Sequence, residues 1–196
     1  MSTKFFQTNS YFIDEKLNFL KFENEYKVFD ESGSSTGAVL QKISFGQKLL
    51  RLLVNKAMLP FKLDFVNVDN VVEASLSRGW TFFMSKLTVT DGTGTSIATI
   101  KQKFKFFKPT FRIFDSTETQ IAEITGDWKA WNFSIKDMNG NEIGIISKKW
   151  GGLAKEVFTS ADKYNVSITV PLKNEDHKKA ILSCAIAIDM ILKETK

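Results

Sequence analysis

A segment near the C-terminus, residues 180–192, constrains the fold more than any other part of the chain. Only Ser183 and Asp189 interrupt its apolar side chains, so a helix here is apolar in every direction. Such a helix must be surrounded by protein or by lipid. The run is shorter than the ~20 residues that span a bilayer, and Asn174 or Asp176 can cap its first turn. We therefore expect a buried core helix and not a transmembrane one.

Composition narrows the class of protein. The chain has 196 residues and three prolines, and no run of Gly, Ser or Pro resembles a linker, so we expect one domain, 1–196. One cysteine, Cys184, excludes an intramolecular disulfide framework and fits a reducing compartment. No apolar segment of the signal-peptide kind follows the start, so we expect a cytoplasmic location. The net charge of +5 is modest, and its distribution matters more than its sum.

A repeated pattern fills the middle of the chain. Residues 26–30 alternate apolar and polar side chains, a Gly/Ser-rich turn follows, and 38–43 resume the alternation. Alternation on both sides of a turn predicts a β-hairpin. In each copy an aspartate closes the first segment, although Asp, Asn and Gly are favoured in any turn for local reasons. Three further copies occur at 87–91 with 97–100, at 111–115 with 121–124, and at 133–137 with 143–146.

The hairpins predict a mainly β protein. Long antiparallel sheets avoid exposed edges most completely by closing into a barrel. A barrel wide enough to have a lumen must fill it, and the apolar helix at 180–192 is the element suited to that place. We therefore expect a closed antiparallel barrel wound round a buried apolar C-terminal helix, and not an empty ligand-binding cup.

Two stretches carry basic charge with no acid among it. In the first, we expect one helix over 47–58, which Pro60 prevents from continuing. Its polar arc holds Lys48 and Arg51 among leucines, so it suits a helix half-buried on the barrel or lying in a membrane interface. We favour the half-buried position. Both residues remain candidates for binding lipid.

In the second stretch, alternate residues of a predicted strand are lysines. Lys101, Lys103 and Lys105 share one face of this strand, and Lys108 follows. A solvated strand face explains the pattern without a ligand, but like charges in a row are costly unless they meet anions. We take these four lysines as candidates for binding anionic lipid.

One segment resembles a known family. Residues 145–162 spell IISKKWGGLAKEVFTSAD. This segment closely resembles the I-S-K-x-W-x-G-x-x-x-E-x-F-T-x-A-D motif of the phospholipid scramblase and LURP-one-related proteins. The pair Ile188-Asp189 resembles the family's I-D pair in its closing helix. The resemblance implies a tubby-like fold, with about twelve strands wound round a C-terminal helix, and an association with lipid. The family-motif residues that we single out are Ser147, Lys148, Trp150, Gly152, Glu156, Phe158, Thr159, Asp162 and Asp189.

The segment also departs from the family in a way that bears on metal binding. Scramblases carry an acidic loop after the Phe-Thr pair that has been assigned to calcium. Here Asp162 is followed by Lys163. Calcium takes about six to eight oxygen ligands, several of them carboxylates, so one aspartate beside a lysine makes a poor site. We expect no metal, no cofactor and no dependence on calcium.

The sequence disfavours catalysis and nucleic-acid binding. The only histidine, His177, is expected on the surface near a helix start, and Cys184 is expected to be a small core residue. No motif of a phosphate-binding loop, a serine hydrolase or a zinc protease occurs. Tryptophans near lysines at 128–131 and 148–150 could stack on bases, but barrel walls commonly hold tryptophan.

Two functions from different classes remain open. The first is a non-enzymatic, peripheral module that binds anionic phospholipid at the inner face of a membrane, and it predicts clustered basic residues. The second is a soluble cytoplasmic scaffold or partner-binding protein, and it predicts dispersed basic residues with an exposed apolar groove elsewhere.

Overall fold

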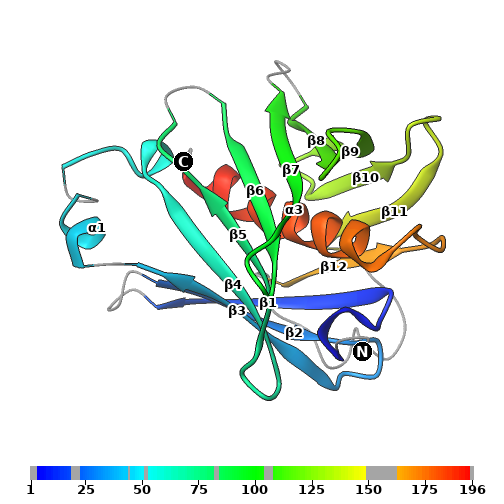
Figure 1. Cartoon of the computed structure of the whole chain (residues 1–196), viewed down its shortest axis with the longest axis horizontal. Coiled ribbons are helices and arrows are strands. Elements are labelled where there is room, and N and C mark those ends of the chain that lie inside the picture. The colour runs from blue at the N-terminus through cyan, green and yellow to red at the C-terminus, as the bar shows by residue number, and fades with distance from the viewer. Residues whose placement is uncertain are drawn as a thin grey trace.

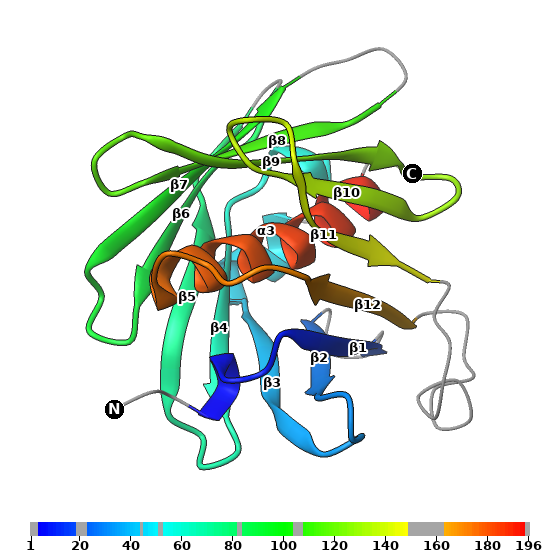
Figure 2. The same ribbon diagram turned by 90° about the vertical axis from the view of Figure 1, so that its right-hand side faces the viewer.

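The computed structural model describes residues 4–18, 23–43, 45–50, 53–81, 84–103, 108–148 and 163–194. Its strands form a closed antiparallel barrel in which order around the wall follows order along the chain, and β1 closes the barrel against β12 (Figures 1 and 2). This confirms the predicted mainly β barrel. The strands are β1 (Ser10–Asn18), β2 (Glu23–Phe29), β3 (Ser35–Lys42), β4 (Phe61–Asn67), β5 (Val72–Arg78), β6 (Lys86–Asp91), β7 (Ser96–Lys103), β8 (Thr110–Asp115), β9 (Gln120–Asp127), β10 (Asn132–Lys136), β11 (Glu142–Ser147) and β12 (Lys163–Ile168).

A long helix, α3 (Glu175–Glu194), runs through the barrel (Figure 2). Every residue of 180–191 is at most 4% exposed, as the all-round apolar sequence predicts. The helix packs against β6, β7 and β8. Asn174 caps its start, because the Asn174 Oδ1 accepts the backbone N–H of His177 at 2.9 Å. The core helix therefore fills the lumen, which confirms that prediction.

Five hairpins share one turn geometry, in which an Asp or Asn side chain organises the backbone. The Oδ1 atom of the first turn residue accepts the N–H groups two and four residues on. The residue three positions on has positive φ, and a bulge follows in the ladder. These are features of three-residue hairpin loops that end in a left-handed residue. The first residues are Asp30, Asn67, Asp91, Asp115 and Asp137, and the positive-φ residues are Gly33, Asn70, Gly94, Glu118 and Gly140.

These five turns lie at one end of the barrel, which we call the turn end. The β3–β4, β5–β6, β7–β8 and β9–β10 connections lie at the opposite end, which we call the loop end, because strands alternate in direction around the wall. The helix α3 starts at the turn end, since β12 finishes there with Ile168 opposite Gly144. A short 3-10 helix, η1 (Lys4–Phe6), occupies the turn end, where Phe5 and Phe6 are buried against Phe65.

The predicted helix over 47–58 was wrong in extent. The helix α1 (Phe45–Leu50) ends at Leu50, and a separate 3-10 turn, η2 (Lys56–Met58), follows. The Asn55 side chain accepts the N–H of Ala57 at 2.9 Å, and the Asn55 carbonyl accepts the N–H of Met58 at 3.0 Å. Asparagine thus starts a new turn instead of continuing the helix, because its side chain competes for backbone donors. Residues 51 and 52 lie outside the described part.

Candidate functional site

The structure places only part of the lysine row of β7 where a ligand can reach it freely. Lys103 is exposed at the loop end, and Lys108 is exposed where the chain returns toward β8. Neither makes an ion pair with a described residue. The helix α1 carries Lys48 at the same end, but the Lys48 side chain, Arg51 and Lys105 lie outside what the structure describes.

Lys101, by contrast, is held against the barrel wall. Its Nζ lies 2.9 Å from the Glu118 Oε2 and 4.2 Å from the centre of the Phe114 ring. The hydrogen bond from Lys101, followed by its charge, lowers the pKa of Glu118. In the sheet Lys101 stands between Lys86 and Arg112. Acidic partners relieve this like-charge contact, so Lys101 is a weaker candidate for lipid than the sequence suggested.

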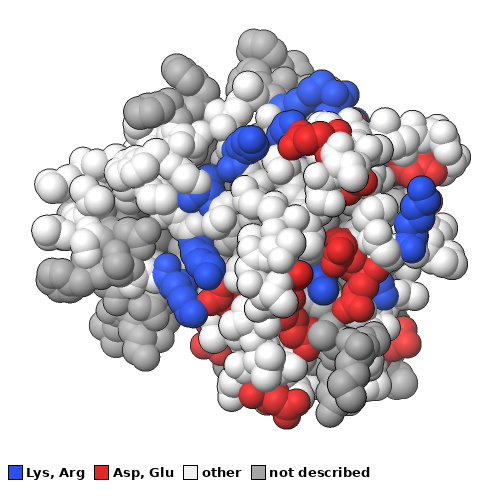
Figure 3. All heavy atoms as spheres, viewed as in Figure 1, with Lys and Arg blue, Asp and Glu red and all other residues white. Residues whose placement is uncertain are grey.

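Charge is divided between the two ends of the barrel. The five turns at the turn end contain Asp30, Glu31, Asp69, Asp91, Asp115, Glu118 and Asp137 and no Lys or Arg. At the loop end, exposed lysines follow the wall from the β3–β4 connection to the β7–β8 connection. In Figure 3 a band of Lys and Arg crosses from the left to the top, and most Asp and Glu lie to the right and below. We call the exposed loop-end lysines from β3 to the β7–β8 connection the basic arc: Lys42, Lys62, Lys86, Lys103 and Lys108. Lys129, which is exposed in the β9–β10 connection, lies outside this arc.

Two members of the basic arc share a buried carboxylate. Lys42 lies 2.6 Å and Lys62 lies 3.3 Å from Asp64, which is 2% exposed at its side chain. Ser75 donates to the same carboxylate at 2.7 Å. Burial acts to raise the pKa of Asp64, but the hydrogen bond from Lys42 and its other partners lower it overall. The charge of this pair of lysines is therefore partly offset, which leaves Lys86, Lys103 and Lys108 as the less compensated cations of the arc.

Lys42, Lys62 and Lys86 were not predicted from the sequence as binding residues. Each stands at the loop-end terminus of a strand: β3 ends at Lys42, β4 begins beside Lys62, and β6 begins at Lys86. A lysine at a strand end next to a long connection is a signal that the sequence does contain. Such lysines indicate a shared binding surface only when it is known which connections lie at the same end of the barrel. The order of strands in the barrel supplies that information.

The family-motif residues that the structure describes belong to the core more than to the surface. Ser147 is buried, and the Lys148 Nζ lies 5.2 Å from the centre of the Trp131 ring. Trp131 also packs edge-on to Tyr164, with ring centres 5.8 Å apart. Burial, and then the charge of Asp189, raise the pKa of the Tyr164 phenol. The other motif residues, Trp150, Gly152, Glu156, Phe158, Thr159 and Asp162, lie outside the described residues.

This arrangement links the motif to the helix. Trp131 has φ of 50°, a left-handed backbone that a bulky residue seldom adopts. The Trp131 carbonyl accepts the N–H of Lys148 at 3.4 Å, which joins the β9–β10 connection to the end of β11. Asp189, on the loop-end half of α3, is buried at 1% exposure. The described motif residues thus connect β11, β12 and α3, and their role in the described structure is packing.

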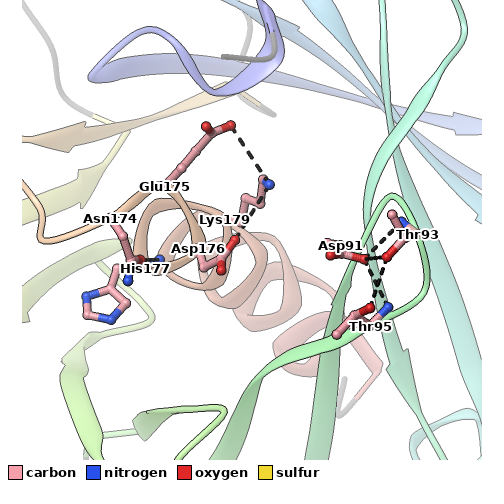
Figure 4. A network of polar contacts seen from close by, with 8 residues as sticks. All are labelled: Asp91, Thr93, Thr95, Asn174, Glu175, Asp176, His177 and Lys179. Carbon is pink, nitrogen blue, oxygen red and sulfur yellow. Dashed lines mark hydrogen bonds and ion pairs between the residues drawn. The ribbon is translucent and has the colours of Figure 1, made fainter. Parts of the chain in front are cut away.

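The turn end holds a hollow and a network of polar contacts, and Figure 4 shows the polar contacts. Lys179 lies 3.9 Å from Glu175 and 3.7 Å from Asp176, within the first turns of α3. A hollow of about 650 Å³ lies between the β8–β9 and β10–β11 turns and the start of α3. Desolvation lowers the pKa of His177 on its wall, although Asp115 acts to raise it. The Asp115 Oδ1 is already engaged by Thr117 and Thr119.

The described residues offer little for covalent or metal chemistry. Cys184 is fully buried in α3, and burial raises the pKa of its thiol. His177 is partly buried at the helix start. Within the described ranges, no three His, Cys, Asp or Glu side chains are grouped so that they could hold a metal ion. The exposed cations of the loop end are therefore the most distinctive surface feature.

Comparison with protein families decides the relationship. The family described as scramblase matches residues 7–194, nearly the whole chain. The chain belongs to the scramblase family. No curated protein and no solved structure matches it. The resemblance first noticed in one segment thus extends over the barrel of this scramblase-family protein, and it supports a lipid-related role. In the described part of this scramblase-family chain, no helix has both the length and the apolar character needed to cross a membrane.

Proposed function

We propose that this scramblase-family barrel binds the surface of anionic phospholipid membranes through the basic arc at its loop end, without calcium and without catalysing a reaction. The observation that carries the proposal is the division of charge, with acids in the turns and exposed lysines at the opposite end. Membership of the scramblase family supports a lipid-related role. A molecule with this uneven distribution of charge is attracted to an anionic surface in one orientation, with the loop end toward the membrane.

Lys86, Lys103 and Lys108 are the primary contacts in this proposal. Each is exposed, and each contributes about 1 kcal/mol to the binding free energy near an anionic leaflet. Three such residues give roughly 3 kcal/mol, which is about a hundredfold in partitioning and suits reversible attachment. Lys48, Arg51 and Lys105 belong to the same proposed site by their sequence positions. Lys101 is secondary, because its ammonium already pairs with Glu118.

The alternative, a soluble scaffold, gains less support. It predicts dispersed basic residues, whereas most exposed lysines of the described strands lie in the basic arc at the loop end, with Lys136 on the turn-end side as the exception. The hollow at the turn end mixes acids, a lysine and a histidine with apolar residues. Nothing in its lining favours one class of protein partner over another. The lipid-binding proposal is therefore the better supported of the two.

The test is sedimentation with liposomes. We expect the parent protein to bind vesicles containing phosphatidylserine at low salt, to ignore phosphatidylcholine vesicles, and to dissociate at about 0.5 M salt as the Debye length shrinks. The double variant Lys103→Glu/Lys108→Glu should bind at least about thirtyfold more weakly, since each lost positive charge removes about 1 kcal/mol.

The matched control is Lys136→Glu/Lys173→Glu. Both residues are exposed and belong to the turn-end side, so the control changes net charge equally at the opposite end. We expect its binding to remain close to that of the parent. Equal loss in the two double variants would mean that net charge alone governs binding, and it would refute the loop-end site. Failure of the parent to bind at low salt would refute the proposed function itself.

A further inference from the structure

Large apolar side chains stand in solvent beside the basic arc. Leu49 and Leu53 are 56% and 79% exposed in and just after α1, and Trp80 and Met84 are 55% and 52% exposed in the β5–β6 connection. Exposed apolar groups that gather beside charged residues are typical of interaction sites. We call these four residues the apolar crest.

Hydrogen bonds hold the crest in place. The Thr81 N–H donates to the Met58 carbonyl at 3.2 Å, which joins the β5–β6 connection to η2. The Thr81 hydroxyl donates to the Met84 carbonyl at 2.8 Å, which closes the tip of that connection. Leu53 is likewise fixed, because its N–H donates to the Leu50 carbonyl at 3.0 Å. The exposed side chains are therefore carried on ordered backbone.

The crest also lies next to the basic arc. The Ser85 N–H donates to the Gln102 side chain at 3.0 Å, and the Gln102 N–H donates to the Ser85 carbonyl at 2.9 Å. Met84 and Lys103 are the neighbours of this pair in sequence, so the β5–β6 connection and the end of β7 are joined at the loop end. Figure 1 shows α1 at the left edge and the β5–β6 connection above it, on the side where the C-terminus emerges.

We propose that the apolar crest enters the boundary between lipid headgroups and acyl chains while the basic arc meets the anionic headgroups. This inference rests on the proposed function and adds a second, apolar component to it. The occupant is a lipid surface because the crest is flanked by cations, and a bilayer offers anions above an apolar layer in the same order. Tryptophan is enriched at such interfaces, where its ring sits at headgroup level. The barrel then stands on its loop end.

Two consequences follow for binding. Salt screens the contribution of the lysines but leaves burial of apolar surface in place. At salt concentrations below about 0.5 M that already weaken the arc, the crest contacts should therefore sustain some of the binding. Removal of two crest side chains should reduce partitioning about tenfold or more, because each large apolar side chain favours leaving water for an apolar environment. These two effects distinguish insertion of the apolar crest into the bilayer from electrostatic attraction of the basic arc.

A labelled cysteine tests insertion directly. We suggest an environment-sensitive fluorophore on Met84→Cys, with Met138→Cys as the matched control, because Met138 is 58% exposed in the β10–β11 turn at the opposite end. The native Cys184 is fully buried and should stay unlabelled. With phosphatidylserine vesicles we expect a blue shift at position 84 and quenching by brominated lipid there. We expect neither effect at position 138.

A pair of substitutions supplies the second measurement. Leu53→Ser/Trp80→Ser should lose about tenfold or more in sedimentation with phosphatidylserine vesicles, whereas Val71→Ser/Met138→Ser, which removes exposed apolar groups at the turn end, should not. Vesicle binding by the parent without a shift at position 84, or with equal shifts at both positions, would overturn insertion and leave the proposed function standing. No binding by the parent at low salt would overturn both.

Discussion

The turn end and the loop end of this barrel differ in the structure of their connections and in the side chains that they expose. At the turn end, five hairpins repeat one arrangement in which a side-chain oxygen binds backbone N–H groups two and four residues on. Apolar rings of Phe5 and Phe6 are buried there. At the loop end the connections are dissimilar, and they expose lysines and large apolar side chains. The turn end therefore fixes the register of the strands, while the loop end carries the exposed groups to which we assign membrane binding.

The largest expected effect is the loss of stability on removing a buried ring from the turn end. Phe5→Ala should lower the free energy of unfolding by about 3–5 kcal/mol, because Phe5 is fully buried and its ring centre lies 5.9 Å from that of Phe65. Leu53→Ala at the loop end should change it by less than about 0.5 kcal/mol, since Leu53 is exposed. Urea denaturation measures both. Similar losses in the two variants would contradict the division of roles.

A smaller effect should appear as pH falls. Side-chain hydrogen bonds, from Thr93 to Asp91 and from Thr117 to Asp115, and then backbone N–H groups, lower the pKa values of these carboxyls. Asn141 acts likewise on the pKa of Asp137. A lowered folded-state pKa stabilises the fold above the unfolded value of about 3.9, and this stability is lost as the pH falls through the folded value. The melting temperature should therefore drop between about pH 5 and pH 2.

Replacing three of the four capping aspartates by asparagine should flatten that drop. The Asn67 side chain makes the same two backbone contacts, so Asp91→Asn/Asp115→Asn/Asp137→Asn should keep the turns at neutral pH while removing three titrating groups. Glu31→Gln/Asp69→Asn, which removes turn-end charge but no capping carboxylate, is the control. If the control flattens the melting curve as much as the triple variant does, net charge and not turn capping controls the acid response.

The smallest expected effect is that of calcium. With Asp162 followed by Lys163, we expect millimolar calcium to produce neither saturable heat nor a shift in melting temperature, and we expect vesicle binding to be the same in calcium and in chelator. Isothermal titration and the sedimentation assay measure these. Saturable binding tighter than about 0.1 mM that disappears in Asp162→Ala would show that a calcium site exists.

The sequence predicted well wherever the controlling interaction is local. Four aspartate turns could be recognised because their hydrogen bonds span two to four residues. The fifth turn was missed because it begins with Asn67 and not with the aspartate that closes the first segment of each recognised copy. The helix over 47–58 was predicted too long, because the competing hydrogen bonds of Asn55 are not visible in an apolar periodicity.

The sequence by itself determined that 180–191 must be enclosed, since a helix with apolar side chains on all faces has no other stable place in water. It also determined the family, through residues that match one by one.

Only the tertiary structure decided which lysines are available. Lys101 and Glu118 are far apart in sequence and meet at 2.9 Å because β7 and β8 are neighbours in the wall. Closure of the barrel likewise brings α1, the β5–β6 connection and Lys103 to one end, because strand direction alternates around it. Long-range pairing sets such neighbours, and local sequence patterns do not encode it.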